Sequence, residues 1–346
     1  MSRLYQLLLW LVCAVTLAGC RTAGSEDPAS ARAVYYWRTE YRLSAAERTF
    51  LSGHRVTHLY MHLFDVVRRG GGLQPNATIR ISDSIPAGVT VIPVVFIAYD
   101  ALRDTTGWSR LPSLVASRVV DVMVSNGLAR PAELQIDFDW TATNQEYYFQ
   151  FLTQLRQALQ EQGIARLSAT IRLHQLTMAP PPVDYGALMV YNTGQYADVR
   201  ERCSILTPQS VQPYLRHLSH YPLPLCTALP IYHWDLLYHG DHFECILRGV
   251  DLSDTARFEQ VDATHYRSQS YQAIPIGPVS MQGDGRILPG DVVHHESVSA
   301  AVLDSVRQML QRERPTMCDR LILYHLDQQQ FNQYENEELE RLYLGR

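Results

Sequence analysis

The pattern of apolar and polar positions alternates between two kinds of segment from residue 33 onward. Short runs rich in β-branched and aromatic residues predict strands, and longer amphipathic stretches between them predict helices. The predicted strands are Val34–Trp37, Val56–Phe64, Val91–Tyr99, Glu133–Asp139, Leu167–Leu173, Ala187–Tyr191, Cys226–His233 and Leu321–Leu326. The predicted helices are Ser44–Ser52, Pro112–Asn126, Asn144–Gln162, Val211–His220 and Val298–Arg312.

This alternation predicts an α/β protein, a (β/α)8 barrel over residues 33–346. The alternative is a doubly wound open sheet. That fold normally carries a Gly-rich phosphate loop after its first strand, whereas Tyr35-Tyr36-Trp37-Arg38 stands here. Two segments depart from the alternation. Residues 68–90 are rich in Gly and Pro, and residues from about 240 to 296 predict a small β-rich insertion after the seventh strand.

The first twenty residues have the pattern of a secretory signal peptide. Arg3 precedes an apolar run, Leu7–Ala18, which is shorter than the roughly 20 residues that a membrane span needs. Leu17-Ala18-Gly19-Cys20 resembles the lipobox of bacterial lipoproteins, which implies a lipid on Cys20. The alternatives are an ordinary cleaved signal or an N-terminal anchor.

Residues 21–32 are small and polar and predict a tether between Cys20 and the barrel. Ser25-Glu26-Asp27 resembles the acidic export tag of surface lipoproteins. We therefore expect an exported protein, anchored in a membrane by its lipid, at the outer membrane or the cell surface.

Composition and charge narrow the function classes. Hydrophobic residues make up 46% and charged residues 19%, which is typical of a globular protein and excludes disorder. A net charge of −5 argues against a nucleic-acid partner. Export permits disulfides, but the pairing among Cys203, Cys226, Cys245 and Cys318 stays open. Because no CxxC or His/Cys cluster occurs, we expect neither a metal nor a cofactor.

Polar and aromatic residues follow nearly every predicted strand. In a barrel of this type the carboxyl ends of the strands meet at one mouth, where catalysis takes place. The residues at these ends are Trp37, Arg38, Glu40, Asp65, Tyr99, Asp100, Asp137, Asp139, Trp140, Arg172, His174, Tyr191, Asn192, Tyr232, His233, Trp234, Asp235, His325 and Asp327. Their number predicts a working pocket at the mouth.

The fourth predicted strand carries the most informative motif, Leu134-Gln135-Ile136-Asp137-Phe138-Asp139-Trp140. Because side chains alternate along a strand, Asp137 and Asp139 share one face, roughly 6–7 Å apart at Cα. We expect both to point into the barrel, where two close carboxylates repel each other and raise at least one pKa. The alternative is a pair neutralised by Arg172 or another buried base.

These residues resemble the glycoside hydrolase family 18 superfamily, the chitinases and endo-β-N-acetylglucosaminidases. The fourth strand of that family reads Asp-Gly-x-Asp-x-Asp-x-Glu. Asp137, Asp139 and Trp140 match the second aspartate, the third aspartate and the frequent aromatic residue. The sixth strand often reads Met-x-Tyr-Asp/Asn, which Met189-Val190-Tyr191-Asn192 matches in full. Leu134 and Gln135 replace the first Asp and the Gly, as expected of a divergent branch.

The resemblance implies a mechanism in which the substrate's own acetamido oxygen attacks the anomeric carbon. It implies that Asp139 orients the acetamido group, that Asp137 supports the pKa of Asp139, and that Tyr191 positions the acetamido oxygen. The ligand is then a carbohydrate containing N-acetylhexosamine. The further residues expected to contact it are Trp37, Tyr99, Asp100, Trp140, Asn192, Trp234, Asp235 and Asp327.

One departure from the family pattern affects the proton donor. Thr141 stands where the family has its acidic Glu, and a hydroxyl cannot replace a carboxylic acid as proton donor at neutral pH. General acid catalysis contributes about 10²–10⁴-fold. Three alternatives remain: Asp139 acts as the acid with Asp137 or Asp100 as partner; Asp235, Asp327 or Glu40 supplies it; or the barrel binds glycan without cleaving it. Glu133 begins its strand and belongs at the opposite end, and Glu146 belongs to a helix N-terminus.

Three functions therefore compete. The first is a lipid-anchored glycosidase acting on an envelope or extracellular glycan, and the second is a catalytically inactive glycan-binding or surface-assembly barrel. The third is a metal-dependent amidohydrolase, for which the strand-end residues His62, His174, His233 and His325 are the candidates. Against the third function, the first strand of such enzymes carries a His-x-His motif, whereas this sequence has Tyr35-Tyr36-Trp37 there. His294-His295, His217 and His220 are expected on the surface.

Overall fold

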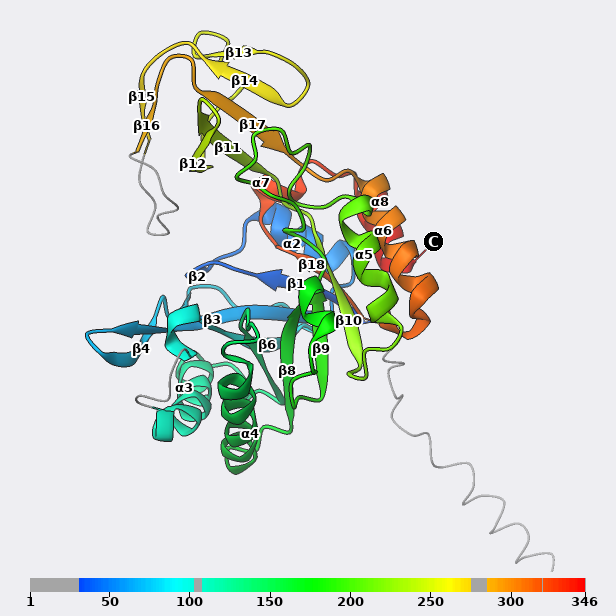
Figure 1. Ribbon diagram of the computed structural model, residues 1–346. Coiled ribbons are helices and arrows are strands. Elements are labelled where there is room, and N and C mark those ends of the chain that lie inside the picture. The colour runs from blue at the N-terminus through cyan, green and yellow to red at the C-terminus, as the bar shows by residue number, and fades with distance from the viewer. Residues whose placement is uncertain (1–30, 103–107, 275–284, 319, 346) are drawn as a thin grey trace, which may run out of the picture.

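Eight parallel strands close into a barrel in the computed structural model, which describes residues 31–102, 108–274, 285–318 and 320–345. The ring closes because β1 pairs in parallel with both β3 and β18 (Figure 1). The barrel strands are β1 (Ala31–Tyr36), β3 (His58–Arg69), β6 (Thr90–Ile97), β7 (Glu133–Asp137), β8 (Arg166–Arg172), β9 (Tyr185–Met189), β10 (Leu225–Pro230) and β18 (Arg320–Tyr324). Each overlaps a predicted strand, so the (β/α)8 barrel is confirmed.

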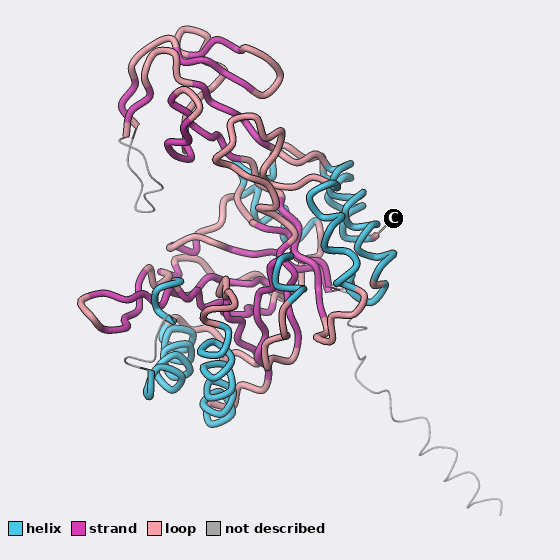
Figure 2. The backbone as a smooth tube through the Cα atoms, viewed as in Figure 1, coloured by secondary structure: helices cyan, strands magenta, loops and turns pink. Residues whose placement is uncertain are grey.

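The helices lie outside the barrel (Figure 2). They are α2 (Ala45–Gly53), α3 (Leu111–Ser125), α4 (Gln145–Glu161), α5 (Pro208–Leu218), α6 (Ala300–Glu313), α7 (Gln328–Phe331) and α8 (Asn336–Leu344). The first five overlap the predicted helices. Ser44 begins α2 with a reciprocal capping box, in which its hydroxyl accepts from the Glu47 backbone and the Glu47 side chain accepts from Ser44.

Two of the barrel units replace their helix with other structure. β3 continues into an antiparallel hairpin with β4 (Gly72–Asn76), and the Gly/Pro-rich segment then adds β5 (Arg80–Ile81), which pairs with β2 (Glu40–Tyr41). β8 is followed by a 3-10 turn, Leu173–Thr177. The hairpin extends the wall of the barrel beyond its mouth on one side (Figure 1).

An antiparallel sheet interrupts the chain between β10 and α6. Its strands are β11 (Trp234–His239), β12 (His242–Leu247), β13 (Phe258–Gln260), β14 (His265–Ser268) and β17 (Val292–Glu296), and a small pair, β15 (Gln272–Ala273) with β16 (Arg286–Ile287), extends from it. The sheet therefore starts at Trp234, directly after β10. The expectation that His294 lies on the surface is wrong: its side chain is buried, with its ring stacked on His265 at 4.3 Å between centroids.

The core has two layers separated by the barrel wall. Side chains that alternate inward form one cluster, which includes Ala33, Tyr35, Tyr60, Val94, Ala187, Met189, Ala228 and Ile322. The alternate set faces the helices and forms a much larger cluster. The period of two in each strand thus assigns polar inward positions, such as Gln135 and Thr170, to the barrel interior.

The floor of the barrel carries a buried polar network at the amino ends of the strands. Glu133 accepts hydrogen bonds from Ser168 Oγ (2.7 Å) and from the Tyr185 hydroxyl. Tyr185 also contacts Tyr60 (2.8 Å between hydroxyls), and Arg320 donates to both phenols. Glu133 therefore lies at the end opposite the mouth, as the sequence predicted.

Two cysteines, Cys203 and Cys226, are free thiols, and the side chain of Cys318 lies outside the described part. Burial raises the pKa of Cys226 to about 12, so it stays protonated. No helix in the described ranges is long and apolar enough to cross a bilayer. The predicted signal peptide, Cys20 and nearly all of the tether fall in residues 1–30, outside those ranges.

Acid should weaken the contact between α8 and the start of the barrel. Hydrogen bonds from Arg32 lower the pKa of Glu340 to about 2, against partial burial, and His54 and Arg55 assist. A carboxyl with a depressed folded-state pKa stabilises the fold above its unfolded pKa of about 4.5, and this stabilisation is lost as the pH falls toward 2. We expect Glu340→Gln to flatten the decline of the melting temperature between pH 4.5 and 2.5. A variant with the wild-type decline would contradict this role.

Candidate functional site

The carboxyl end of β7 places a charged pair inside the mouth. Asp137, the last residue of β7, is buried and accepts hydrogen bonds from Thr170 Oγ1 (2.6 Å) and Arg172 Nη2 (2.9 Å) on β8. Burial opposes the charge of Arg172, but Asp137, Tyr191 and Asp139 outweigh it and raise the pKa of Arg172. Asp137 is thus neutralised by Arg172, which is the alternative that the sequence left open, and of the two aspartates expected inside the barrel only Asp137 is buried there.

Asp139 lies beyond the end of β7 and reaches solvent, with 57% of its side chain exposed. Its Oδ1 accepts a hydrogen bond from Gln175 Nε2 (3.0 Å) and lies 3.5 Å from His174 Nε2. Gln175 is fully buried and also bonds the Trp140 carbonyl and the Arg172 backbone N–H. Asp139 is therefore an open carboxylate: it is accessible to a ligand and is held in place by the buried Gln175. Asp137 is buried and its hydrogen bonds are already made.

The residue at the position of the family acid belongs to a cluster of hydroxyls. Thr141 Oγ1 lies 2.7 Å from Thr143 Oγ1, and the Thr141 backbone N–H donates to Asn144 Oδ1. Hydrogen bonds with Thr143 and Thr141 lower the pKa of the exposed Tyr99. This cluster offers donors and acceptors to a sugar hydroxyl, and it contains no carboxylate.

Aromatic rings form a continuous wall along the other side of the mouth. Tyr191 stacks on Tyr324 (5.0 Å between centroids, 27°) and meets Tyr232 edge-on. Burial and the Tyr324 phenol raise the pKa of Tyr191 well above its usual value, so its hydroxyl is a donor. Tyr324 also contacts Trp37 at 6.0 Å. The rings therefore form one contiguous aromatic cluster at this side of the mouth.

Asp65 enters the mouth because of a β-bulge. Strict alternation after His62 would turn Phe64 inward and Asp65 outward, but the register of β3 shifts between His62 and Phe64. Asp65 Oδ1 consequently lies 2.7 Å from His62 Nε2 inside the barrel, and Asp65 pairs in register with Phe96, which pairs with Asp137. The sequence placed Asp65 at a strand end but gave no sign of this rotation.

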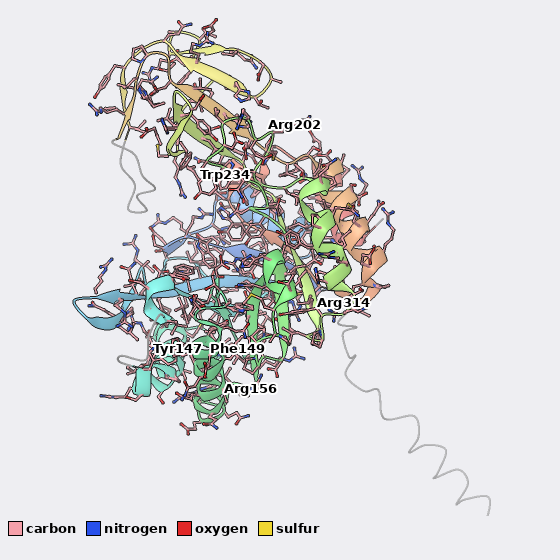
Figure 3. All side chains as sticks on the ribbon, in the orientation of Figure 1. Tyr147, Phe149, Arg156, Arg202, Trp234 and Arg314 are labelled. Carbon is pink, nitrogen blue, oxygen red and sulfur yellow. The ribbon has the colours of Figure 1, made fainter. Side chains whose placement is uncertain are left out.

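The antiparallel insertion contributes two residues next to the aromatic wall. Trp234 contacts Tyr232 at 5.7 Å and donates its indole N–H to Glu296 (2.8 Å), at the junction of barrel and insertion (Figure 3). The register Asp235↔Leu247 places the exposed Arg248 one residue further, beside Trp234. Burial first, and then the charges of Arg38 and Arg248, lower the pKa of His325 to about 4 against the influence of Asp327. His325 is therefore neutral at pH 7.

Several residues that the sequence assigned to the site are buried or engaged elsewhere, away from a ligand at the mouth. Trp140 is fully buried and stacked on Tyr148 (5.3 Å) in the outer core, so its assignment to substrate binding is wrong. Consecutive side chains in an extended segment point to opposite faces, so Trp140 points to the helices while Asp139 points to the mouth. Asp235 pairs with His295 (2.7 Å) in the insertion, and Asp327 caps α7. Glu40 pairs with Arg80 and Arg42 on the surface, so none of these three carboxylates replaces the missing acid.

The remaining predicted residues lie at the rim. Tyr99 and Asp100 are exposed on the turn after β6, where the Asp100 carbonyl accepts from Arg68. Asn192 is exposed and accepts from the Tyr232 hydroxyl. Within the described ranges, no three His, Cys, Asp or Glu side chains gather as metal ligands would. The mouth thus combines the open carboxylate of Asp139, the arginine-bound carboxylate of Asp137, the Asp65 carboxylate paired with His62, and an aromatic wall.

Comparison with known proteins gives a likeness of fold. The sequence matches no protein-family model and no curated protein. The chitinase from Chromobacterium violaceum ATCC 12472 has a TM-score of 0.53 at 13% identity, over 92% of this chain and 98% of that one. The Bacillus cereus spore cortex-lytic enzyme SleL has a TM-score of 0.50 at 15% identity, over 91% of this chain and 74% of that one. A chitinase from Bacteroides thetaiotaomicron has a TM-score of 0.50 at 10% identity, over 92% of this chain and 97% of that one.

At these identities the likeness establishes the fold. The chain has the barrel found in chitinases and in a cortex-lytic enzyme. The resemblance to the family 18 barrel that the motifs of β7 and β9 indicate is confirmed at that level, in a divergent sequence.

Proposed function

We propose that this protein is a glycoside hydrolase-like barrel that acts on a cell-envelope or extracellular glycan containing N-acetylhexosamine. The observation that carries the proposal is the placement of Asp139 as an open carboxylate on the same mouth as Tyr191. Both residues interact electrostatically with Arg172. In this proposal Asp139 orients the acetamido group, and the Tyr191 hydroxyl donates a hydrogen bond to the acetamido oxygen. The ion pair of Asp137 with Arg172 holds a fixed charge next to these two residues.

The structural neighbours support a glycan as the ligand class. Two of them are a chitinase and a spore cortex-lytic enzyme, and a mutant of a plant class V chitinase from Cycas revoluta, similar in fold (TM-score 0.50, 10% identity), was solved in complex with (GlcNAc)3. The aromatic wall of Trp37, Tyr324, Tyr191, Tyr232 and Trp234 suits stacking on pyranose rings.

A non-catalytic glycan-binding barrel is the second candidate, and the hydroxyl cluster at Thr141 favours it. Product analysis with chitin oligomers, N-glycans and peptidoglycan fragments separates the two. New reducing ends support the hydrolase, whereas saturable binding without product supports the binding barrel. If none of the three substrates is bound or cleaved, both the hydrolase and the binding barrel are contradicted.

The lipobox-like Leu17-Ala18-Gly19-Cys20 supports anchoring of the barrel to a membrane through Cys20, at the outer membrane or cell surface. Without the thiol no lipid can be attached. We expect Cys20→Ser to lose labelling by a clickable fatty acid, and Cys13→Ser to keep it. Equal labelling of both variants would contradict the anchor.

A further inference from the structure

We propose that the end of the barrel opposite the mouth holds a binding site for a phosphate group, carried by an anionic lipid headgroup or a soluble phosphate ester. The site is a cavity of about 480 Å³ at the amino ends of β8, β9, β10 and β18. Its lining includes three arginines, Arg166, Arg314 and Arg320, together with Thr316. This site is independent of the proposed glycan chemistry.

The three guanidinium groups lack direct carboxylate partners among the described residues. Arg320 donates through Nη1 to the Tyr60 and Tyr185 hydroxyls (2.8 and 3.0 Å), and Tyr185 in turn donates to the buried Glu133, so Arg320 reaches a carboxylate only through a phenol. Arg314 donates to the backbone carbonyls of Tyr221 and Leu223 (2.8 and 2.9 Å). Carbonyl and phenol acceptors orient a guanidinium and leave its positive charge uncompensated.

The acid that lines the cavity is already engaged. Asp184 lines the cavity, but its carboxylate accepts from Arg156 Nη1 (2.9 Å) and from the Leu167 backbone N–H (2.8 Å). Arg166 is exposed and forms no ion pair within the part of the chain that the structure describes. The cavity therefore carries a net positive charge that suits the phosphate of an anionic lipid or of a soluble ester, and guanidinium groups bind phosphate oxygens in a fork geometry.

The local titration behaviour agrees with a positive potential at this end. Burial, then the charges of Arg320 and Arg166, lower the pKa of His58 to about 4. An anion in the cavity would oppose the contribution of these two arginines to the pKa of His58.

The position of the cavity favours a lipid as the source of the phosphate. β1 begins at Ala31, whose register partner is Arg320 in the cavity wall. Ten residues separate Cys20 from Ala31, and the eleven steps of chain between these two residues span at most about 40 Å. A lipid on Cys20, which belongs to the proposed function, would keep this end near the bilayer, while Trp234 and the mouth lie at the other end from Arg314 (Figure 3).

Calorimetric titration of the full chain tests the site with three probes: dihexanoyl phosphatidylglycerol, dihexanoyl phosphatidylcholine and inorganic phosphate. We expect phosphatidylglycerol to bind more tightly than phosphatidylcholine, and Arg166→Gln to weaken its binding about tenfold. Arg166 is exposed, so its replacement should leave the fold intact. The matched control is Arg55→Gln, which removes an exposed charge from the loop before β3 at the same end, outside the cavity.

The outcomes divide cleanly. If inorganic phosphate binds as tightly as phosphatidylglycerol and both weaken in Arg166→Gln, the site stands with a soluble phosphate as its ligand. The absence of binding by any anion overturns the site, and so does an equal loss in Arg55→Gln. Hydrolysis or binding of glycans by the same preparations reports on the mouth separately.

Discussion

Asp139→Asn should lower turnover of an N-acetylhexosamine glycan by at least about 100-fold. The amide keeps the shape of the side chain and can still contact Gln175, but it removes the charge that faces the developing positive charge on the substrate. Asp137 cannot substitute for it, because Thr170 and Arg172 occupy its Oδ1 and it is buried. Initial rates of product release, measured by chromatography of labelled oligosaccharides, give the ratio.

Glu146→Gln is the matched control for this experiment. Glu146 is an exposed carboxylate in the first turn of α4, close to Asp139 in sequence but on the helix. Its replacement should leave turnover within about twofold of the wild type. Equal rates for the wild type and Asp139→Asn would remove Asp139 from the mechanism.

Arg172→Met should destabilise the fold by about 3 kcal/mol, the low end of the range for breaking a buried ion pair. The substitution leaves the Asp137 carboxylate inside the barrel with Thr170 as its remaining partner. Only 7% of the Asp137 side chain is exposed, so water cannot replace the guanidinium. Urea unfolding followed by tryptophan fluorescence measures the difference.

Arg156→Met supplies the comparison for Arg172→Met. Its ion pair with Asp184 is 2.9 Å long but more than 30% exposed on either side, and exposed pairs contribute at most about 1 kcal/mol. A loss for Arg172→Met no greater than that for Arg156→Met would show that Asp137 does not depend on its arginine.

The regular part of the fold could be predicted from the sequence because it follows from periodicity. Every barrel strand overlaps a predicted strand, and the position of Glu133 at the start of its strand assigned it correctly to the end opposite the mouth. Alternation also placed Asp137 on the inward face, although it could not decide between a repelling pair and an ion pair. That choice depends on Arg172, which lies 35 positions away along the chain.

The irregular features could not be predicted from the sequence. The bulge in β3 turns Asp65 inward, and nothing in the local sequence announces it. Trp140 is a different case, because the alternation that exposes Asp139 already predicts that Trp140 faces the helices, and only the family motif assigned it to the ligand. The place of Arg248 beside Trp234 follows from a hairpin register in the insertion that residue composition does not specify.

Titration of the wild-type protein with chitin oligomers and with their deacetylated counterparts tests the central claim most directly. With a site at the mouth that recognises the acetamido group, calorimetry should show saturable binding of the acetylated oligomers only, weakened at least tenfold by Trp37→Ala, since Trp37 stands in the aromatic wall. Equal binding of both oligomers would contradict recognition of the acetamido group, and unchanged binding in the variant would contradict a carbohydrate site at this mouth.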